Sequence, residues 1–367
     1  MRCYSCLKTI ETGQYCRQCR NQLFDGRKVT PLTFDKKEFY RQRRALADRM
    51  SISGVQDKIS LSFSEDGTLQ PTAKDGRYIL KPIPLTEALD HSEDIAANEH
   101  LSMLLSRDVF KIPTALSALI EFKDGEKAYI TRRFDYSAET VSGVPVKHDQ
   151  EDFASILDRT SETNGKNYKY DASYEAVARA IRQFVPAYLP TLEDFYRRIL
   201  LNYLIGNGDA HLKNFSLYRA AGQKEWKLTP NYDLLFTRYH IPNELGYMGL
   251  DLYEEENETE TFRQMGYYTL EDFESFAGMI GLPQKRLIKL FDSLLQKTPE
   301  VIEKVEISYL SEAGKHAYLK NYLERLKLHL CYSIESGPFK GQTQPVIDRH
   351  MPMIETLYSR YVKSLGA

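Results

Sequence analysis

Several features of membrane or nucleic-acid-binding proteins are missing from this sequence. No apolar stretch approaches the roughly 18 residues that a membrane-spanning helix needs. The opening residues Met-Arg-Cys-Tyr-Ser-Cys lack the apolar segment of a secretory signal. Neither sign of charge is in excess, since 49 basic and 51 acidic residues leave a net charge of −2. We therefore expect a cytoplasmic protein with no membrane partner and no overall positive field to attract nucleic acid directly.

Internal repeats and low-complexity tracts are also missing, and tryptophan occurs once against 25 tyrosines and 17 phenylalanines. So many aromatic residues argue against a disordered chain. A length of 367 residues suits two or three domains with a sizeable buried core.

Cysteine is rare, but four of the five cysteines fall within the first 19 residues. Cys3, Cys6, Cys16 and Cys19 follow the pattern C-x2-C-x9-C-x2-C, which can place four thiolates around one ion. We expect a structural zinc site in residues 1–24; two disulfides or unbound thiols are the alternatives, and a reducing cytosol disfavours disulfides. A closed shell of four thiolates leaves no position for water, which argues against a catalytic metal. Cys331, in an apolar segment, is expected to be a buried core thiol.

Strand-like and helix-like patterns are unevenly distributed along the chain. Up to about residue 135 the patterns favour short strands and one long helix, which Ser92 would cap and which would run to about Ser106. From residue 136 the pattern turns helical. Strands are expected at the end of 50–63, at 78–81 and as a pair within 115–134, and a short hairpin is expected around Gly222. The expected helices are a short one in 25–48, one at 173–185, one at 191–205, and several in 270–335 and 345–364.

One polar motif is more informative than any of these patterns. Asp209 precedes Asn214 by five positions, which is the catalytic-loop spacing of protein kinases. Asp233 supplies a second carboxylate downstream, while Lys81 ends a strand-like run and Glu99 lies on a predicted helix upstream. Each residue alone has an ordinary structural explanation as a surface charge, turn residue or cap. Together, in this order, they favour phosphoryl transfer.

Each residue of this set has a predicted role, because phosphoryl transfer depends mainly on positioning and charge neutralisation. Asp209 is the candidate base or hydroxyl-orienting group. Asn214 and Asp233 would hold Mg²⁺ through hard oxygen ligands. Lys81 would neutralise the α- and β-phosphates of ATP, and Glu99 would hold Lys81 by an ion pair.

Two further candidates lie inside the catalytic-loop motif, and others lie upstream of the first strand. His211 and Lys213 could each place positive charge near the γ-phosphate, although a structural histidine is an equally weighted alternative. Residues 51–58 stand where a phosphate loop is expected, although with a single glycine they form a weak motif. Backbone N–H groups and hydroxyls could still cradle phosphates there; the candidates are Ser51, Ser53, Gly54 and Val55.

These observations predict an α+β, two-lobed, protein-kinase-like fold preceded by a small four-cysteine module. The expected domains are the cysteine module at 1–24, a β-rich N-lobe with the phosphate loop at 25–135, and a mostly helical C-lobe with the catalytic loop at 136–367. Two lobes that meet at a cleft suit nucleotide binding.

The motifs resemble those of the HipA family of bacterial serine/threonine kinases over roughly residues 48–335. The run Gly-Asp-Ala-His-Leu-Lys-Asn at 208–214 is the most specific of them. The other matching segments are Ser-Gly-Val-Gln-Asp-Lys-Ile-Ser (53–60), Tyr-Ile-Leu-Lys-Pro (78–82), Asn-Glu (98–99), Arg-Arg-Phe-Asp (132–135), Gln-Glu-Asp (150–152) and Leu-Thr-Pro-Asn-Tyr-Asp (228–233).

The resemblance implies the toxin component of a toxin–antitoxin module. It implies an ATP- and magnesium-dependent kinase that acts on a protein such as an aminoacyl-tRNA synthetase. It also implies autophosphorylation of a phosphate-loop serine, for which Ser51 aligns best and Ser53 is the second choice. Arg132 to Phe134 would match the hinge that binds adenine through its backbone.

One departure from the long family form sets this sequence apart. That form has a β-rich subdomain of about a hundred residues before the phosphate loop, whereas only about 50 residues, including the cysteine module, precede it here. The sequence thus resembles the short, HipT-like form. Two partners are implied: a small, separately encoded subunit equivalent to that subdomain, and a helix-turn-helix antitoxin through which any nucleic-acid contact would be made.

Two other classes of function remain open at this point. A small-molecule phosphotransferase of the aminoglycoside or lipid-kinase type uses the same arrangement of Asp, Asn and Asp. A pseudokinase that binds a partner through its zinc module would need none of the catalytic residues, so their presence argues against it.

Overall fold

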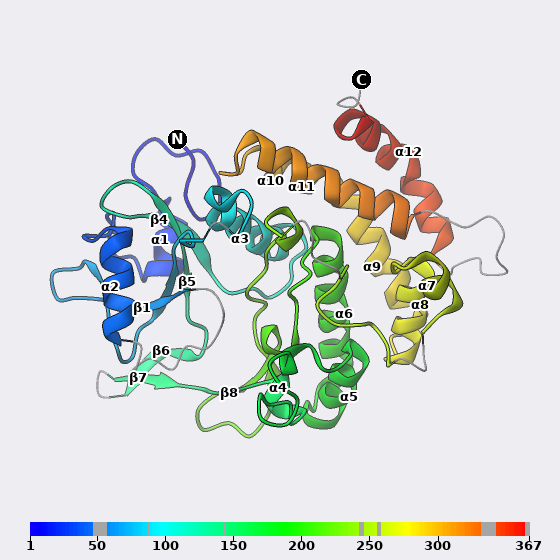
Figure 1. The fold of residues 1–367 in the computed structure, drawn as a ribbon, viewed down its shortest axis with the longest axis horizontal. Helices are drawn as coiled ribbons and strands as arrows, with labels where there is room; N and C mark the ends of the chain where they lie inside the picture. The colour runs from blue at the N-terminus through cyan, green and yellow to red at the C-terminus, as the bar shows by residue number, and fades with distance from the viewer. Residues whose placement is uncertain are drawn as a thin grey trace.

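The computed structural model describes residues 1–46, 57–86, 88–141, 144–241, 246–254, 258–331 and 343–363. A β-rich region occupies one end of the molecule and a helical region the other (Figure 1). The candidate phosphate-loop residues Ser51, Ser53, Gly54 and Val55 lie outside the described residues.

A five-stranded antiparallel sheet with the strand order β2-β1-β3-β5-β4 forms the centre of the β-rich region. Its strands are β1 (Ile59–Phe63), β2 (Leu69–Pro71), β3 (Tyr78–Lys81), β4 (Ser117–Glu121) and β5 (Lys127–Arg132). The alternation in β1 turns Ile59 and Leu61 into the core, where both are fully buried. The expected strands at 59–63, at 78–81 and around the turn at 124–125 are confirmed.

Three helices accompany this sheet: α1 (Arg17–Phe24), α2 (Lys36–Leu46) and α3 (Ile95–Leu104). The helix α3 packs against β4 and β5, and all ten of its residues are buried. The predicted cap of this helix was wrong. Ser92 instead begins a short 3-10 turn (Ser92–Asp94), and after α3 the chain continues in a π-helical turn (Leu105–Val109). The N-terminus of α3 has no side-chain cap.

Most of the described residues between 136 and 152 form strands, whereas the sequence pattern predicts helix there. The strands are β6 (Tyr136–Val141), β7 (Val144–Lys147) and β8 (Asp149–Asp152). Residues 140–146 contain one threonine and three valines, β-branched residues that favour strands over helices. Strand β8 pairs with β9 (Ser216–Arg219), which also pairs with β10 (Lys227–Leu228) as the expected hairpin. This small sheet brings residue 152 beside the segment that follows the catalytic-loop motif.

The rest of the chain is mainly helical, as the sequence predicts. Its helices are α4 (Phe153–Ile156), α5 (Tyr174–Phe184), α6 (Tyr188–Ile205), α7 (Glu260–Met265), α8 (Leu270–Met279), α9 (Gln284–Gln296), α10 (Thr298–Glu306), α11 (Glu312–Glu324) and α12 (Gln344–Tyr361). Shorter 3-10 or π-helical turns lie at Tyr168–Tyr170, Leu212–Asn214, Thr237–Tyr239 and Arg325–Leu330. None of the helices in the described ranges is both long and apolar enough to cross a bilayer.

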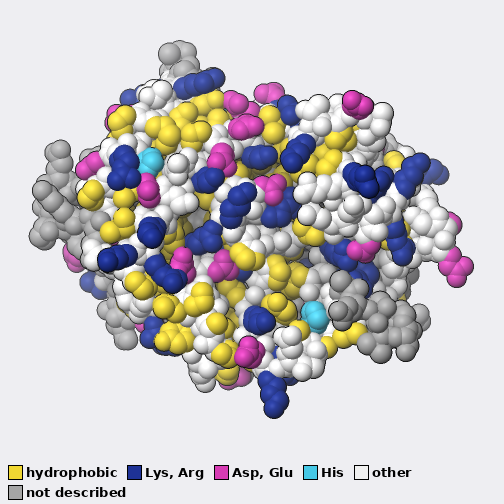
Figure 2. Space-filling view, turned by 180° about the vertical axis from the view of Figure 1, so that it is seen from behind, with side chains coloured by type: hydrophobic (Ala, Val, Ile, Leu, Met, Phe, Trp, Pro, Cys, Tyr) yellow, Lys and Arg dark blue, Asp and Glu magenta, His cyan; other side chains and the backbone are white. Residues whose placement is uncertain are grey.

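The described residues form two hydrophobic clusters. The larger is built around α3, α5, α6 and the later helices. The smaller combines the five-stranded sheet with α1, α2 and the cysteine module, so that Phe24 and Tyr15 share one core with Tyr78. Charged side chains of both signs are interspersed over the face seen in Figure 2, in keeping with the nearly neutral net charge.

Candidate active site

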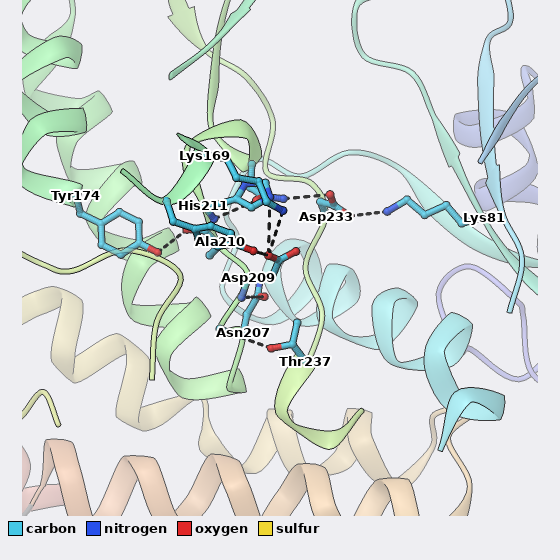
Figure 3. Close-up of polar contacts among 12 residues, drawn as sticks. Lys81, Lys169, Tyr174, Asn207, Asp209, Ala210, His211, Asp233 and Thr237 are labelled. Atoms are coloured by element: carbon cyan, nitrogen blue, oxygen red, sulfur yellow. Dashed lines mark hydrogen bonds and ion pairs between the residues drawn. The ribbon is translucent and has the colours of Figure 1, made fainter. Parts of the chain in front are cut away.

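The three charged residues predicted from distant parts of the sequence meet at one point. The ammonium nitrogen of Lys81, at the end of β3, lies 2.6 Å from Glu99 Oε1 on α3 and 2.5 Å from Asp233 Oδ1. The side chains of Lys81 and Glu99 are 7% and 2% exposed, whereas that of Asp233 keeps 41% of its surface exposed. One lysine therefore links the sheet, the helix α3 and the loop after β10. Figure 3 shows its contact with Asp233.

The backbone at Asp233 has an unusual conformation that aims its side chain. Its φ angle is +60°, a left-handed conformation that aspartate adopts more readily than most residues. Asp233 Oδ2 accepts a hydrogen bond of 3.1 Å from the side-chain amide of Asn214. Asn214 Oδ1 in turn accepts from the His211 backbone N–H at 3.1 Å and retains a second lone pair. Two oxygen-bearing side chains are thus held side by side.

A left-handed glycine and two hydrogen bonds to the Thr237 hydroxyl hold the backbone of the loop that contains Asp209. Helix α6 ends at Gly206 in a left-handed conformation with φ of +76°, and a Cβ there would lie 2.9 Å from side-chain atoms of Phe236 and Asn321. The Thr237 hydroxyl accepts from Gly208 N–H at 2.8 Å and donates to Gly206 O at 3.2 Å. This part of the sequence therefore requires glycine at 206 for conformation and for space.

The carboxylate of Asp209 projects from this loop with 46% of its side-chain surface exposed. Lys169 Nζ lies 3.7 Å and His211 Nε2 lies 3.8 Å from Asp209 Oδ1 (Figure 3). The same oxygen accepts a hydrogen bond from the Tyr170 hydroxyl. Next in the chain, Ala210 O accepts a 2.7 Å hydrogen bond from Tyr174 on α5. Asp209 is accessible, and its environment is positive and hydrogen-bonding.

Lys213 and His211 point to different neighbours. Lys213 Nζ lies 2.6 Å from Asp152 Oδ2 at the end of β8, so this ammonium is engaged by a carboxylate that the sequence interpretation gave no role. His211 Nδ1 is buried and has no hydrogen-bond partner among the described residues. Burial lowers the pKa of His211, although the Asp209 carboxylate opposes this effect. A largely neutral imidazole is therefore expected beside Asp209 at neutral pH.

Lys81, Glu99 and Asp233 together form what we call the lysine junction. Their pKa values are shifted because two carboxylates share one ammonium. Burial raises the pKa of Glu99 to about 7, with the Lys81 charge acting in the opposite direction. Partial desolvation tends to raise the pKa of Asp233, but the charges of Lys81 and Lys58 lower it to about 2. Burial tends to lower the pKa of Lys81, but Asp233 and Glu99 raise it above its ordinary value. At neutral pH the junction thus has a charged lysine, a charged Asp233 and a titrating Glu99.

Two residues near this site had no role in the sequence interpretation. Burial lowers the pKa of Lys58, just before β1, and Asp233 and Glu99 oppose that shift, which places Lys58 in the electrostatic field of the same junction. Gly249 packs so closely on the catalytic loop that a Cβ there would lie 2.5 Å from Ala210 N. Lys58 could have been found from its place as the last residue of the candidate phosphate loop at 51–58, whereas no local signal identifies Gly249.

The candidate hinge residues lie apart from this junction. The Arg132 guanidinium lies 2.6 Å from Asp25 Oδ1 and donates to Gln22 O at 3.0 Å, at the C-terminal end of α1. Its backbone N–H donates to Leu116 O. The ring of Phe134 lies 5.3 Å from that of Tyr232, next to Asp233 in the chain. Only Phe134 of this pair therefore approaches the predicted site through its side chain.

The four N-terminal cysteines come together as the spacing predicts. Their sulfur atoms all lie within 4.8 Å of one another, and those of Cys6 and Cys16 are 3.8 Å apart. A tetrahedral zinc ion with Zn–S bonds of about 2.3 Å places its sulfurs about 3.8 Å apart. All five cysteines are free thiols, so the disulfide alternative is not adopted. The cluster has the composition and spacing of a zinc site.

Cys331 is 3% exposed, as expected for a core thiol. Burial raises its pKa to about 12, which keeps the thiol protonated and unreactive.

Comparison with known proteins identifies the family. Residues 50–302 match the family described as "HipA-like C-terminal domain". The chain belongs to this HipA-like family. The match includes Lys81, Glu99, Asp209, Asn214 and Asp233, so the family assignment and the observed junction concern the same residues.

Two relatives and one solved structure extend the comparison. A Haemophilus influenzae protein named "Putative kinase" is 29% identical over 344 residues, covering 89% of this chain and 96% of its own. "Putative kinase Y4mE" of Sinorhizobium fredii is 26% identical over 76% of this chain and 63% of its own length. A chain of the complex of HipA, HipB and operator DNA from Shewanella oneidensis MR-1 matches with a TM-score of 0.54 and 18% identity, over 91% of this chain and 72% of that one. These matches establish a HipA-like, kinase-like fold of mixed α and β structure.

Proposed function

We propose that this HipA-like protein is an ATP-dependent serine/threonine protein kinase. The observation that supports it most is the meeting of Lys81, Glu99 and Asp233, with Asn214 hydrogen-bonded to Asp233. A kinase needs a lysine for the α- and β-phosphates and oxygen ligands for Mg²⁺ at one place. In this proposal the β-rich and helical regions are the N- and C-lobes of the enzyme, and ATP binds between them.

The residues at the junction fit a magnesium ion. Mg²⁺ prefers hard oxygen ligands and keeps several waters, and Asp233 offers a carboxylate that is 41% exposed, while Asn214 offers an amide oxygen. When bound, Mg²⁺ would neutralise charge on the phosphates. Asp233 now pairs with Lys81, so in the nucleotide-bound enzyme Lys81 would turn from Asp233 toward the phosphates while Glu99 continues to hold it.

Asp209 would orient the acceptor hydroxyl. In the reaction the hydroxyl oxygen bonds to the γ-phosphorus, the bond from that phosphorus to the β–γ bridging oxygen breaks, and the hydroxyl proton passes to the Asp209 carboxylate. The exposure of Asp209 supports access by a macromolecular acceptor. His211, largely neutral, would act as a hydrogen-bonding neighbour, and Lys213 would be kept in place by Asp152.

The four-cysteine cluster would bind one structural zinc ion. Residues 1–24 are too short a segment to fold on hydrophobic burial alone, so metal binding would contribute much of the free energy that folds them. The cluster also attaches to the sheet, since Leu119 N–H donates to Tyr4 O at 3.0 Å. The ion would therefore stabilise the outer edge of the sheet.

A role as the toxin of a toxin–antitoxin module is the proposed biological setting. The matching Shewanella structure contains HipA, HipB and operator DNA, which supports a helix-turn-helix antitoxin as a partner here. We extend this to a small, separately encoded subunit and to an aminoacyl-tRNA synthetase as the phosphorylated protein. Autophosphorylation would occur at Ser51 or Ser53.

Mass spectrometry of the purified protein after incubation with Mg²⁺ and ATP tests the proposal. We expect a gain of one phosphate in residues 51–53, no gain in an Asp209→Asn variant, and no gain in a Ser51→Ala/Ser53→Ala variant. A protein that binds ATP but neither modifies itself nor transfers phosphate to a synthetase would contradict the proposal.

A further inference from the structure

The segment before α5 places a hydroxyl on the proposed catalytic carboxylate. Tyr170, at the end of the 3-10 turn Tyr168–Tyr170, donates its phenolic hydrogen to Asp209 Oδ1. Its ring packs edge-on against that of His211, with centroids 5.3 Å apart. Lys169 adds a second contact, with its ammonium 3.7 Å from the same oxygen. Three neighbours, the third being His211 Nε2 at 3.8 Å, therefore surround Asp209 Oδ1.

This segment is held over the loop by its own hydrogen bonds. Arg159 Nε donates to Asp171 O at 2.7 Å, and the side-chain amide of Asn164 donates to Asp171 Oδ2 at 2.5 Å. These bonds close residues 159–171 into a compact loop whose far end enters α5 at Tyr174. Tyr170 nevertheless keeps 38% of its surface exposed. The phenol is thus presented to Asp209 by a surface loop and is not locked into the core.

We propose that residues 159–171 act as an internal pseudosubstrate, in which Tyr170 fills the acceptor-hydroxyl position at Asp209 until a protein substrate displaces it. The proposal rests on the function assigned above, because it takes Asp209 as the group that orients the acceptor. An O–H donated to a carboxylate is the same interaction that an acceptor serine or threonine would make. A substrate hydroxyl that approaches Asp209 Oδ1 must therefore displace the phenol.

The ring of Tyr170 has two contacts besides the hydrogen bond of its hydroxyl. Its edge rests on His211, and the Lys169 ammonium lies 4.8 Å from its centroid. Such edge-on and cation–π contacts stabilise the position of an aromatic ring. The hydroxyl can then be removed by mutation with the ring contacts retained, which makes the hydrogen bond separable from the packing.

The test uses water as the acceptor, so no protein substrate has to be known. In hydrolysis the water oxygen bonds to the γ-phosphorus, the bond to the β–γ bridging oxygen breaks, and the water proton passes through Asp209 to solvent, leaving ADP and phosphate. Tyr170→Phe should raise ADP production by the full-length protein roughly 10- to 100-fold, the order expected when one hydrogen bond to a charged group is lost from the resting state. The KM for ATP should not change.

Two controls separate this effect from general loosening. Tyr168→Phe removes a hydroxyl two residues away in the same turn and should leave ADP production unchanged. In a Tyr170→Phe/Asp209→Asn double variant the rise should disappear. Unchanged or lower ADP production in Tyr170→Phe would overturn the pseudosubstrate, as would a phosphate on Tyr170 after incubation with ATP, since the residue would then be an acceptor.

Limited trypsin digestion tests the Tyr170–Asp209 contact even if none of the variants hydrolyses ATP. An absence of ATP hydrolysis in every variant and in the wild-type protein would contradict the proposed kinase function, and digestion would still test the contact. Cleavage after Lys166 and Lys169 should be several-fold faster in Tyr170→Phe than in Tyr168→Phe, because the hydroxyl no longer holds the segment to Asp209. Equal cleavage rates in the two variants would overturn the inference.

Discussion

Lys81 and Glu99 form a buried ion pair, with Nζ and Oε1 2.6 Å apart and side chains that are 7% and 2% exposed. The pair joins the last residue of β3 to the middle of α3, and Asp233 approaches the same ammonium from the opposite region of the protein. A buried charge without its partner is costly. The three residues therefore make the arrangement of sheet, helix and loop depend on charge.

Activity should depend on pH through Glu99, whose pKa burial raises to about 7. Below that pH the carboxyl is protonated, and Lys81 depends on Asp233 alone, which is then less available to Mg²⁺. We expect kcat/KM for ATP to fall several-fold from pH 8 to pH 6 in the wild-type protein. Glu99→Gln should be about 10-fold less active at pH 8, with a smaller change over this range.

The ratio of the two pH profiles is the measurement, because titration of ATP itself cancels. Glu93→Gln, with a side chain that is 67% exposed, is the matched control and should follow the wild type.

The pH dependence of stability gives an independent check. The folded protein keeps the Glu99 proton between pH 4.5 and about 7, where the unfolded chain has released it. The free energy of unfolding should therefore fall as the pH rises through this range, less so in Glu99→Gln.

Asp209→Asn should lower the rate of phosphoryl transfer by about 10²- to 10⁴-fold, the usual contribution of a positioned acid–base group. ATP binding should persist, since Lys81, Asn214 and Asp233 remain. Calorimetric titration with Mg²⁺-ATP and a phosphate-transfer assay measure the two quantities. Asp124→Asn, in the exposed turn between β4 and β5, changes the same charge and should leave both unchanged. Near wild-type transfer by Asp209→Asn would disprove the assignment.

Gly249→Ala should impair catalysis although the residue is outside the motif. The added Cβ would lie 2.5 Å from the backbone of Ala210, which can only be relieved by a shift of the loop that positions Asp209. A shift of this kind should lower kcat by about 10²-fold and also lower the melting temperature. Gly278→Ala on α8, where a Cβ meets nothing within 4 Å, should instead stabilise the protein by about 0.5–1 kcal/mol. Equal effects of the two substitutions would contradict this account.

The cysteine cluster should hold about one zinc ion per chain, measurable by elemental analysis of protein prepared without chelator. Cys3→Ser/Cys6→Ser should release the ion. It should also lower the melting temperature of the whole protein, because Tyr15 and Phe24 share a core with the sheet. Cys331→Ala is the control: it creates a small cavity in the helical region and should leave the zinc content unchanged. Protein without zinc would refute the assignment.

The sequence predicted most strands, the main helices and the identity of the residues at the junction. Alternation placed β1 correctly at Ile59–Phe63, and kinase-like spacing selected Asp209, Asn214 and Asp233 before their geometry was known. Its failures were local. Ser92 does not cap α3, and most of the described residues between 136 and 152 pair as strands. Strand pairing depends on partners far along the chain, such as β9 for β8. A local sequence pattern contains no information about those partners.

Chemistry that depends on residue type and spacing was determined by the sequence alone: four sulfurs for one ion, two oxygen ligands, a lysine and a candidate base. Tertiary structure decided which of these groups form ion pairs and which are contacted by other side chains. It gave Lys81 two carboxylates, paired Lys213 with Asp152, and placed Tyr170 on Asp209. These contacts join residues 18 to 152 positions apart. Packing sets such distances, because Coulomb and hydrogen-bond energies depend on separation in space and not along the chain.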